Sequence, residues 1–104
     1  MDDRLRAQLK ETRNLKGEER ERALLALAEK NESAQVFNEL GNYYKEIAAD
    51  QQKAIDMFEK ALSITKDAAI YNNLGSAYFN LAQQERPERK EYMKKTEEAF
   101  QHSV

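Results

Sequence analysis

Apolar side chains recur along the chain at spacings of three and four residues, which is the period of a helix with one buried face. The clearest stripe runs from Phe37 through Leu40 to Tyr44, and another runs from Ala54 to Phe58. Weaker stripes precede and follow these two. The pattern predicts helices at about 2–15, 18–30, 34–49, 51–64, 68–84 and 87–102.

One segment of the chain occurs twice. Residues 37–44, Phe-Asn-Glu-Leu-Gly-Asn-Tyr-Tyr, recur 34 positions later as residues 71–78, Tyr-Asn-Asn-Leu-Gly-Ser-Ala-Tyr. The inward-facing positions of the two copies are predicted to be Leu40, Tyr44, Leu74 and Tyr78. A glycine inside a helix costs about 1 kcal/mol relative to alanine. We therefore expect Gly41 and Gly75 to lie against a neighbouring helix, where the missing side chain permits close packing.

The repeated segment and the stripe that follows it resemble the tetratricopeptide repeat family. The family motif is an aromatic residue followed by x2-Leu-Gly-x2-Tyr and then Ala-x3-Phe-x2-Ala, and residues 34–67 match it nearly throughout. The interval from Tyr44 to Ala54 is one residue longer than the family spacing, and residues 65–67 stand where a proline is usual. The resemblance implies an all-α fold of antiparallel helix-hairpin repeats, stacked as a short right-handed α-α superhelix.

We expect one helical repeat domain that spans residues 1–104. Its first clear repeat is 34–67, and its second is 68–104, with an extended inter-helix region at 83–90. Residues 1–33 are interpreted as a degenerate N-terminal helix pair, because terminal repeats are atypical where one side faces water. Aligned with the first clear repeat, this pair is predicted to place Ala23, Ala26 and Leu27 at the positions of Phe58, Ala61 and Leu62.

The last predicted helix carries an apolar stripe at Thr96, Ala99, Phe100 and Val104, and no polar helix follows it in the sequence. A final repeat is normally covered by such a helix. We therefore expect the chain to be a fragment of a longer repeat protein. Two alternatives stay open: the stripe packs on another chain, which would give self-association, or the lengthened second helix pair covers it.

The residue types argue against catalysis and metal binding. Without cysteine there is no disulfide framework, no thiolate zinc site and no thiol nucleophile. The single histidine, His102, has no second ligand at a metal-binding spacing. The carboxylates stand among Lys and Arg at helical spacing, and the glycines are too dispersed for a phosphate loop. We expect no enzyme activity, no catalytic residue, no metal site and no cofactor.

Charge and hydropathy bear on the remaining partners. The formal net charge is −2, with acids and bases nearly balanced along the chain. The densest basic run, at 86–95, is diluted by glutamates, so no nucleic-acid partner is expected. The N-terminus lacks the apolar core of a signal peptide, and no run of about eighteen apolar residues occurs. The chain is accordingly expected to be cytoplasmic and to have no membrane partner.

Function is predicted on the helix face that the core does not use. In tetratricopeptide proteins the face of the first helix of each repeat lines a concave groove that binds extended peptides or partner helices. Asparagines suit such a groove because each amide both donates and accepts hydrogen bonds. The resemblance implies a scaffold or adaptor that binds a protein or peptide of unknown identity. The predicted contact residues are Asn38, Asn42, Lys45, Asn72, Asn73, Ser76 and Phe79.

Two other interpretations of the sequence compete with this one. Asn42 and Asn73 coincide with two asparagines of the carboxylate clamp that some members of the family use for acidic chaperone tails. Asn38 stands where that clamp needs a lysine, and the basic residues of a following helix are missing. The two asparagines are therefore expected to serve the groove or to form inter-helix hydrogen bonds. The alternative function is a structural, self-assembling module whose exposed repeat faces form homo-oligomers.

Overall fold

The computed structural model describes residues 3–84 and Ala99, and within this part of the chain all regular structure is helical. The helices are α1 (Asp3–Thr12), α2 (Gly17–Lys30), α3 (Ala34–Glu46), α4 (Gln51–Ile64) and α5 (Ala68–Gln84). The expected all-α class is confirmed for these residues, and α4 and α5 have the predicted bounds. Ala99 is helical and buried. The other residues of the predicted last helix and its apolar stripe, including Thr96, Phe100 and Val104, lie outside the described residues, as does His102.

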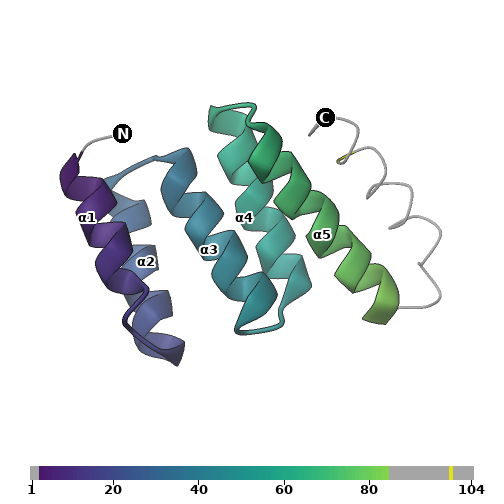
Figure 1. Cartoon of the computed structure of the whole chain (residues 1–104), viewed down its shortest axis with the longest axis horizontal. Helices are drawn as coiled ribbons and strands as arrows, with labels where there is room; N and C mark the ends of the chain where they lie inside the picture. The colour runs from purple at the N-terminus through teal and green to yellow at the C-terminus, as the bar shows by residue number, and fades with distance from the viewer. Residues whose placement is uncertain (1–2, 85–98, 100–104) are drawn as a thin grey trace.

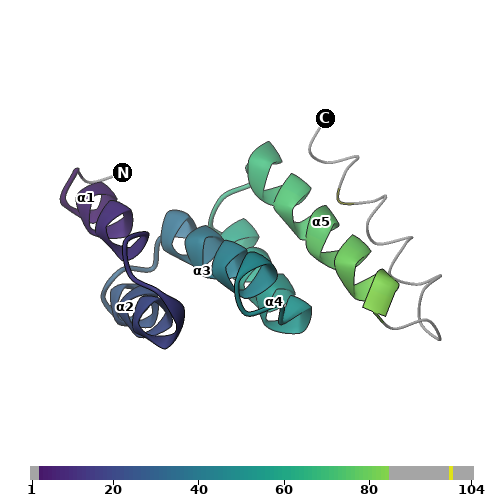
Figure 2. The same ribbon diagram turned by 60° about the horizontal axis from the view of Figure 1, so that its bottom comes forward.

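Successive helices pack against one another and run alternately down and up in the view of Figure 1. In addition, α3 contacts α5 directly, although α4 lies between them in the sequence. Figures 1 and 2 together show that α1, α3 and α5 lie in one row and that α2 and α4 lie in the other. We call these the first row and the second row. Within the first row, α3 contacts α5, and residues of α1 and α3 line one hollow.

The starts of α3 and α5 are capped in the same way. The Ser33 hydroxyl accepts a hydrogen bond from the backbone N–H of Gln35 at 3.2 Å, and the Asp67 carboxylate accepts one from that of Ala69 at 2.7 Å. Such caps satisfy backbone donors that the first helical turn leaves unpaired. Asp50 caps α4 similarly. The caps of α3 and α5 are 34 residues apart, as the repeated segment is.

Buried positions of α3 and α5 also repeat at an interval of 34 residues. The pairs in which both members are buried are Val36 and Ile70, Leu40 and Leu74, Gly41 and Gly75, Tyr43 and Ala77, and Tyr44 and Tyr78. The inward orientation predicted for the Leu and Tyr of each copy is therefore confirmed. Residues at equivalent positions of α3 and α5 are therefore buried in the same pattern.

A close contact between α3 and α4 explains the first of the repeated glycines. A Cβ atom on Gly41 would lie 2.6 Å from Cδ1 and 2.7 Å from Cζ of the Phe58 ring. Phe58 is fully buried. The prediction that Gly41 faces a neighbouring helix is confirmed, and Gly75 is likewise a buried residue inside α5.

Two helices end earlier than predicted. α1 ends at Thr12, whose hydroxyl donates to the Leu9 carbonyl at 2.6 Å, and a turn leads on to Gly17. Gly17 has a φ of 57°, which lies outside the right-handed helical region. α3 ends at Glu46 because Ala49 adopts a φ of 54°, a left-handed conformation that no helix continues through.

The predicted register of α2 is wrong by one residue. Leu24 is fully buried, whereas Ala26 is exposed, so Ala23, Ala26 and Leu27 do not take the places of Phe58, Ala61 and Leu62. The buried or partly buried residues of α2 that stand 34 positions before those three are Leu24, Leu27 and Ala28. Alanines and leucines alternate in this segment, so hydropathy alone did not identify the side that faces α3.

Candidate binding surface

The predicted contact residues lie on α3 and α5 of the first row. In each helix three of them are spaced i, i+4 and i+7, which places them on one side. The set comprises Asn38, Asn42 and Lys45 in α3, and Asn72, Ser76 and Phe79 in α5. Asn72 and Phe79 are exposed, and the others are partly buried. Phe79 keeps 42% of its surface exposed, as a contact residue outside the core would.

Asn73 joins the two helices that carry this surface. Its side-chain amino group donates to the Asn38 side-chain carbonyl at 3.0 Å, in a partly buried position. The inter-helix hydrogen bond expected for Asn73 is thus present. Among the described residues, the Asn38 amino group and the Asn73 carbonyl have no partner. The pair therefore sets the spacing of α3 and α5 while keeping one donor and one acceptor for a ligand.

Gln51, which the sequence pattern did not identify, connects the helices at the end of this surface near Lys45. Gln51, which is buried at the start of α4, donates to the backbone carbonyl of Lys45 at 3.1 Å and accepts from Asn80 of α5 at 3.4 Å. The Lys45 side chain is only 11% exposed, and its ammonium lies 3.9 Å from the Glu46 carboxylate. Lys45 is the charged residue of the predicted set, and little of its side chain is accessible to a ligand.

The two repeated tyrosines each contact a glutamate of the preceding second-row helix. The Tyr78 hydroxyl donates to Glu59 of α4 at 2.9 Å. Burial raises the pKa of Tyr44, and the nearby Glu21 carboxylate of α2 adds to the effect, so that the pKa reaches about 12. The Tyr78 hydrogen bond thus ties α5 to α4, and the Glu21 carboxylate acts on Tyr44 from α2.

A basic hollow, which no sequence motif predicted, lies between α1 and α3. Its volume is about 230 Å³, and it is lined by Arg6, Leu9, Lys10, Arg13, Gln35 and Glu39. The available signal was the i, i+4, i+7 spacing of Arg6, Lys10 and Arg13, which puts three cations on one side of the first predicted helix. That spacing does not show which helix lies opposite, because Gln35 and Glu39 come from a different helix pair.

Among the described residues that line this hollow, the one carboxylate already forms ion pairs. Glu39 is 13% exposed and forms ion pairs with Arg13, after α1, and with Arg20 of α2, the latter at 3.8 Å. The hydrogen bond and the charge of Glu39 raise the pKa of Arg13. Arg20 also lies over the Tyr43 ring, 5.8 Å from its centroid. These contacts fix the wall of the hollow and connect the first helix pair to α3.

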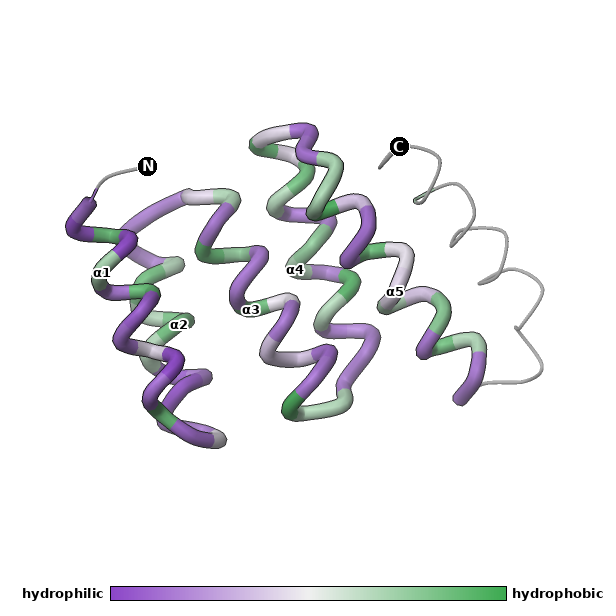
Figure 3. The backbone as a smooth tube through the Cα atoms, in the orientation of Figure 1, coloured by the Kyte–Doolittle hydropathy of each residue, from purple (hydrophilic) through white to green (hydrophobic). Residues whose placement is uncertain are grey.

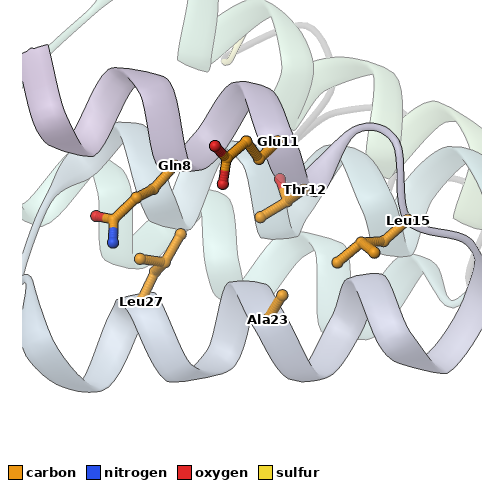
Figure 4. Close-up of a pocket in the computed structure, with 6 residues that line it drawn as sticks. All are labelled: Gln8, Glu11, Thr12, Leu15, Ala23 and Leu27. Carbon is orange, nitrogen blue, oxygen red and sulfur yellow. The ribbon is translucent and has the colours of Figure 1, made fainter.

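A second hollow, of about 300 Å³, lies between α1 and α2 (Figure 4). Gln8, Glu11 and Thr12 extend from α1 towards α2, and Ala23 and Leu27 face them from α2. Leu15, from the connecting turn, closes one end. This hollow is mainly apolar, and it shares no lining residue with the α3–α5 surface.

Within residues 3–84 and Ala99, no cluster of three or more His, Asp or Glu residues has the composition of a metal site. The helices described above also include none that is long and apolar enough to cross a membrane. No protein-family model, curated protein or solved structure matches the chain. Its function therefore has to be inferred from its own residues and contacts.

Proposed function

We propose that this chain is a helical repeat protein of the tetratricopeptide type, which binds a protein or peptide without catalysing a reaction. In this proposal the helix pairs stack as a short right-handed superhelix. α1, α3 and α5 are the first helices of the pairs, and α2 and α4 are second helices. The recurrence of buried positions at an interval of 34 residues in α3 and α5 is the observation that supports it most directly.

The proposed binding surface is the exposed side of α3 and α5. Asn42, Asn72 and Ser76 offer hydrogen-bonding groups, and Phe79 offers an apolar contact. A peptide backbone needs both donors and acceptors along its length, which carboxamides supply without the desolvation cost of a charge. A large apolar side chain among such groups is typical of the few residues that dominate binding energy.

Phe79 provides the sharpest test, because the chain contains a matched control. Ile64 at the end of α4 is 47% exposed, close to the 42% of Phe79, but it lies in the second row. Peptides selected from a random displayed library would be titrated against the parent, Phe79→Ser and Ile64→Ser proteins by fluorescence anisotropy. Circular dichroism would verify that all three remain helical.

We expect Phe79→Ser to weaken the selected peptides by about ten-fold or more, since truncating a central apolar contact typically has an effect of that size. Ile64→Ser should change the affinity by less than about two-fold. Selection of no binding peptide would contradict the proposal, and so would equal losses in the two variants.

The second candidate function is a self-assembling structural module. It is favoured by the large hydrophobic residues that are exposed in the described part of the chain, Leu25, Ile47, Ile64 and Phe79. Sedimentation over a range of concentrations separates the candidates. A monomer that persists as concentration rises supports peptide binding, whereas a tight dimer that Phe79→Ser dissociates would assign the same surface to a second copy of the chain.

A further inference from the structure

We infer that the segment bound by the first row is acidic, and that its carboxylate side chains enter the basic hollow between α1 and α3. This inference rests on the proposed function and adds the chemical class of the partner. The occupant to which we commit is an extended peptide segment with Asp or Glu side chains.

The charges that line the hollow are unbalanced in favour of an anion. Arg6, Lys10 and Arg13 stand against one carboxylate, Glu39. Arg20 of α2 also pairs with Glu39, so two guanidiniums neutralise one partly buried carboxylate. An entering carboxylate therefore meets excess positive charge rather than an exposed carboxylate of the protein.

Lys10 and Arg6 are the cations that remain for a ligand. Within residues 3–84, Lys10 forms no ion pair, and Arg6 is paired only with Asp3, at 3.9 Å. Both members of that pair are strongly exposed, and exposed pairs of this kind contribute little energy. Arg6 can thus exchange Asp3 for a ligand carboxylate at small cost, while the Gln35 amide adds a neutral donor at the α3 wall.

The rest of the first row explains why a peptide, rather than a uniformly charged polymer, fits best. From Asn38 across to Asn72 and Ser76 the surface carries amides and a hydroxyl, and it ends at the apolar Phe79. Along their whole length α1 is largely hydrophilic and α5 has more apolar positions (Figure 3), most of which are buried. A nucleic acid would present phosphates along the whole row, whereas positive charge is concentrated at its α1 end. A peptide can complement both ends of the row, because its acidic residues can lie at α1 and an apolar residue at α5.

The test uses two probe peptides that carry no terminal carboxylate. One is a labelled, amidated peptide that alternates Glu and Ala, and in the other Gln replaces each Glu. The site variant is Arg6→Gln with Lys10→Gln. Its control is Arg22→Gln with Lys30→Gln in α2, which removes the same charge from an exposed ion-paired arginine and an exposed lysine in the last turn of a helix. A second site variant, Arg6→Lys with Lys10→Arg, keeps both charges.

The parent is expected to bind the Glu peptide at least about ten-fold more tightly than the Gln peptide at low salt, as charge-assisted hydrogen bonds require. The Arg6→Gln, Lys10→Gln variant should lose this preference. The α2 control and the charge-conserving variant should retain it to within about two-fold, because only local charge is used. Backbone amide signals of Leu9 and Gln35 should shift on titration with the Glu peptide.

Equal binding of the two peptides by the parent would overturn the inference, as would an equal loss in the site and α2 variants, since that would indicate general attraction to net charge. Failure here is distinguishable from failure of the proposed function. If library-selected peptides depend on Phe79 but carry no preference for acidic residues, the binding surface stands and only the acidic specificity falls.

Discussion

Replacing Gly41 with alanine tests the tightest helix contact in the structure. The new methyl group would overlap the Phe58 ring, lying 2.6 Å from Cδ1 and 2.7 Å from Cζ, whereas ordinary contacts are 3.4–4 Å. The ring or the two helices must therefore move apart by about 1 Å to restore contact distance. Phe58 has no exposed surface into which it can move. The substitution should consequently disturb the packing of α3 on α4.

The expected change in unfolding free energy is a balance of two effects. Overpacking of a close-packed core costs about 1–3 kcal/mol. Alanine recovers about 1 kcal/mol of helix propensity relative to glycine. We therefore expect Gly41→Ala to lower the free energy of unfolding by up to about 2 kcal/mol.

Urea unfolding followed by circular dichroism measures this change, and a double-mutant cycle identifies its cause. In a Phe58→Leu background the obstructing ring is absent, so Gly41→Ala should become neutral or stabilising by up to about 1 kcal/mol. The difference between Gln52→Ala and Gln52→Gly gives the propensity effect at an exposed site of α4, because both substitutions remove the same Gln52 side chain. The gain expected from helix propensity alone is the difference in unfolding free energy between Gln52→Ala and Gln52→Gly. If Gly41→Ala stabilises the parent by that full amount, the steric reasoning is refuted.

Three further predictions follow from local geometry. The folded state holds the Tyr44 proton up to a pKa of about 12 against 10.0 for a free phenol, so unfolding free energy should fall as pH rises between these values. Urea unfolding at several pH values measures this fall in unfolding free energy, which should be shallower in Tyr44→Phe than in the parent. Identical pH dependence in the two proteins would contradict the prediction. Gly17→Ala should cost about 1–2 kcal/mol through its positive φ alone, since no atom lies within 4 Å of the new methyl, while Ala49→Gly should stabilise by about 0.5–1 kcal/mol. Effects of the same sign at these two sites, measured by urea unfolding, would exclude the backbone explanation. Asn38→Ala and Asn73→Ala should each cost about 0.5–1.5 kcal/mol and should be non-additive when combined, and strict additivity would show that their hydrogen bond contributes nothing.

The helices could be predicted because their signals are local. The apolar spacing around Leu40 and Leu74 identifies α3 and α5, and the bounds of α4 and α5 agree with the prediction. Errors occurred where the backbone leaves the helical region without a proline or glycine to mark it. Ala49 is the example: alanine favours helices, yet the connection to α4 requires a φ of 54° there.

The candidate surface was predictable only in part. The 34-residue interval identifies Asn72, Ser76 and Phe79 as equivalents of α3 positions, since a repeat carries its register with it. It does not predict that Asn73 donates to Asn38, because that contact joins residues 35 positions apart in sequence and depends on how closely α5 approaches α3.

The sequence by itself determined that these segments form helices, that the repeated Leu and Tyr of α3 and α5 face inward, and that a glycine faces a neighbouring element. Only the tertiary structure decided that Phe58 is the residue against Gly41, that Leu24 rather than Ala26 faces the core, and that Gln35 and Glu39 complete a hollow with Arg6 and Lys10. The physical reason is the range of each interaction. Helical periodicity and capping act over a few residues and can be read from neighbours in the chain. The distance and register between helices result from many weak packing contacts summed over both surfaces, and no short segment contains that sum.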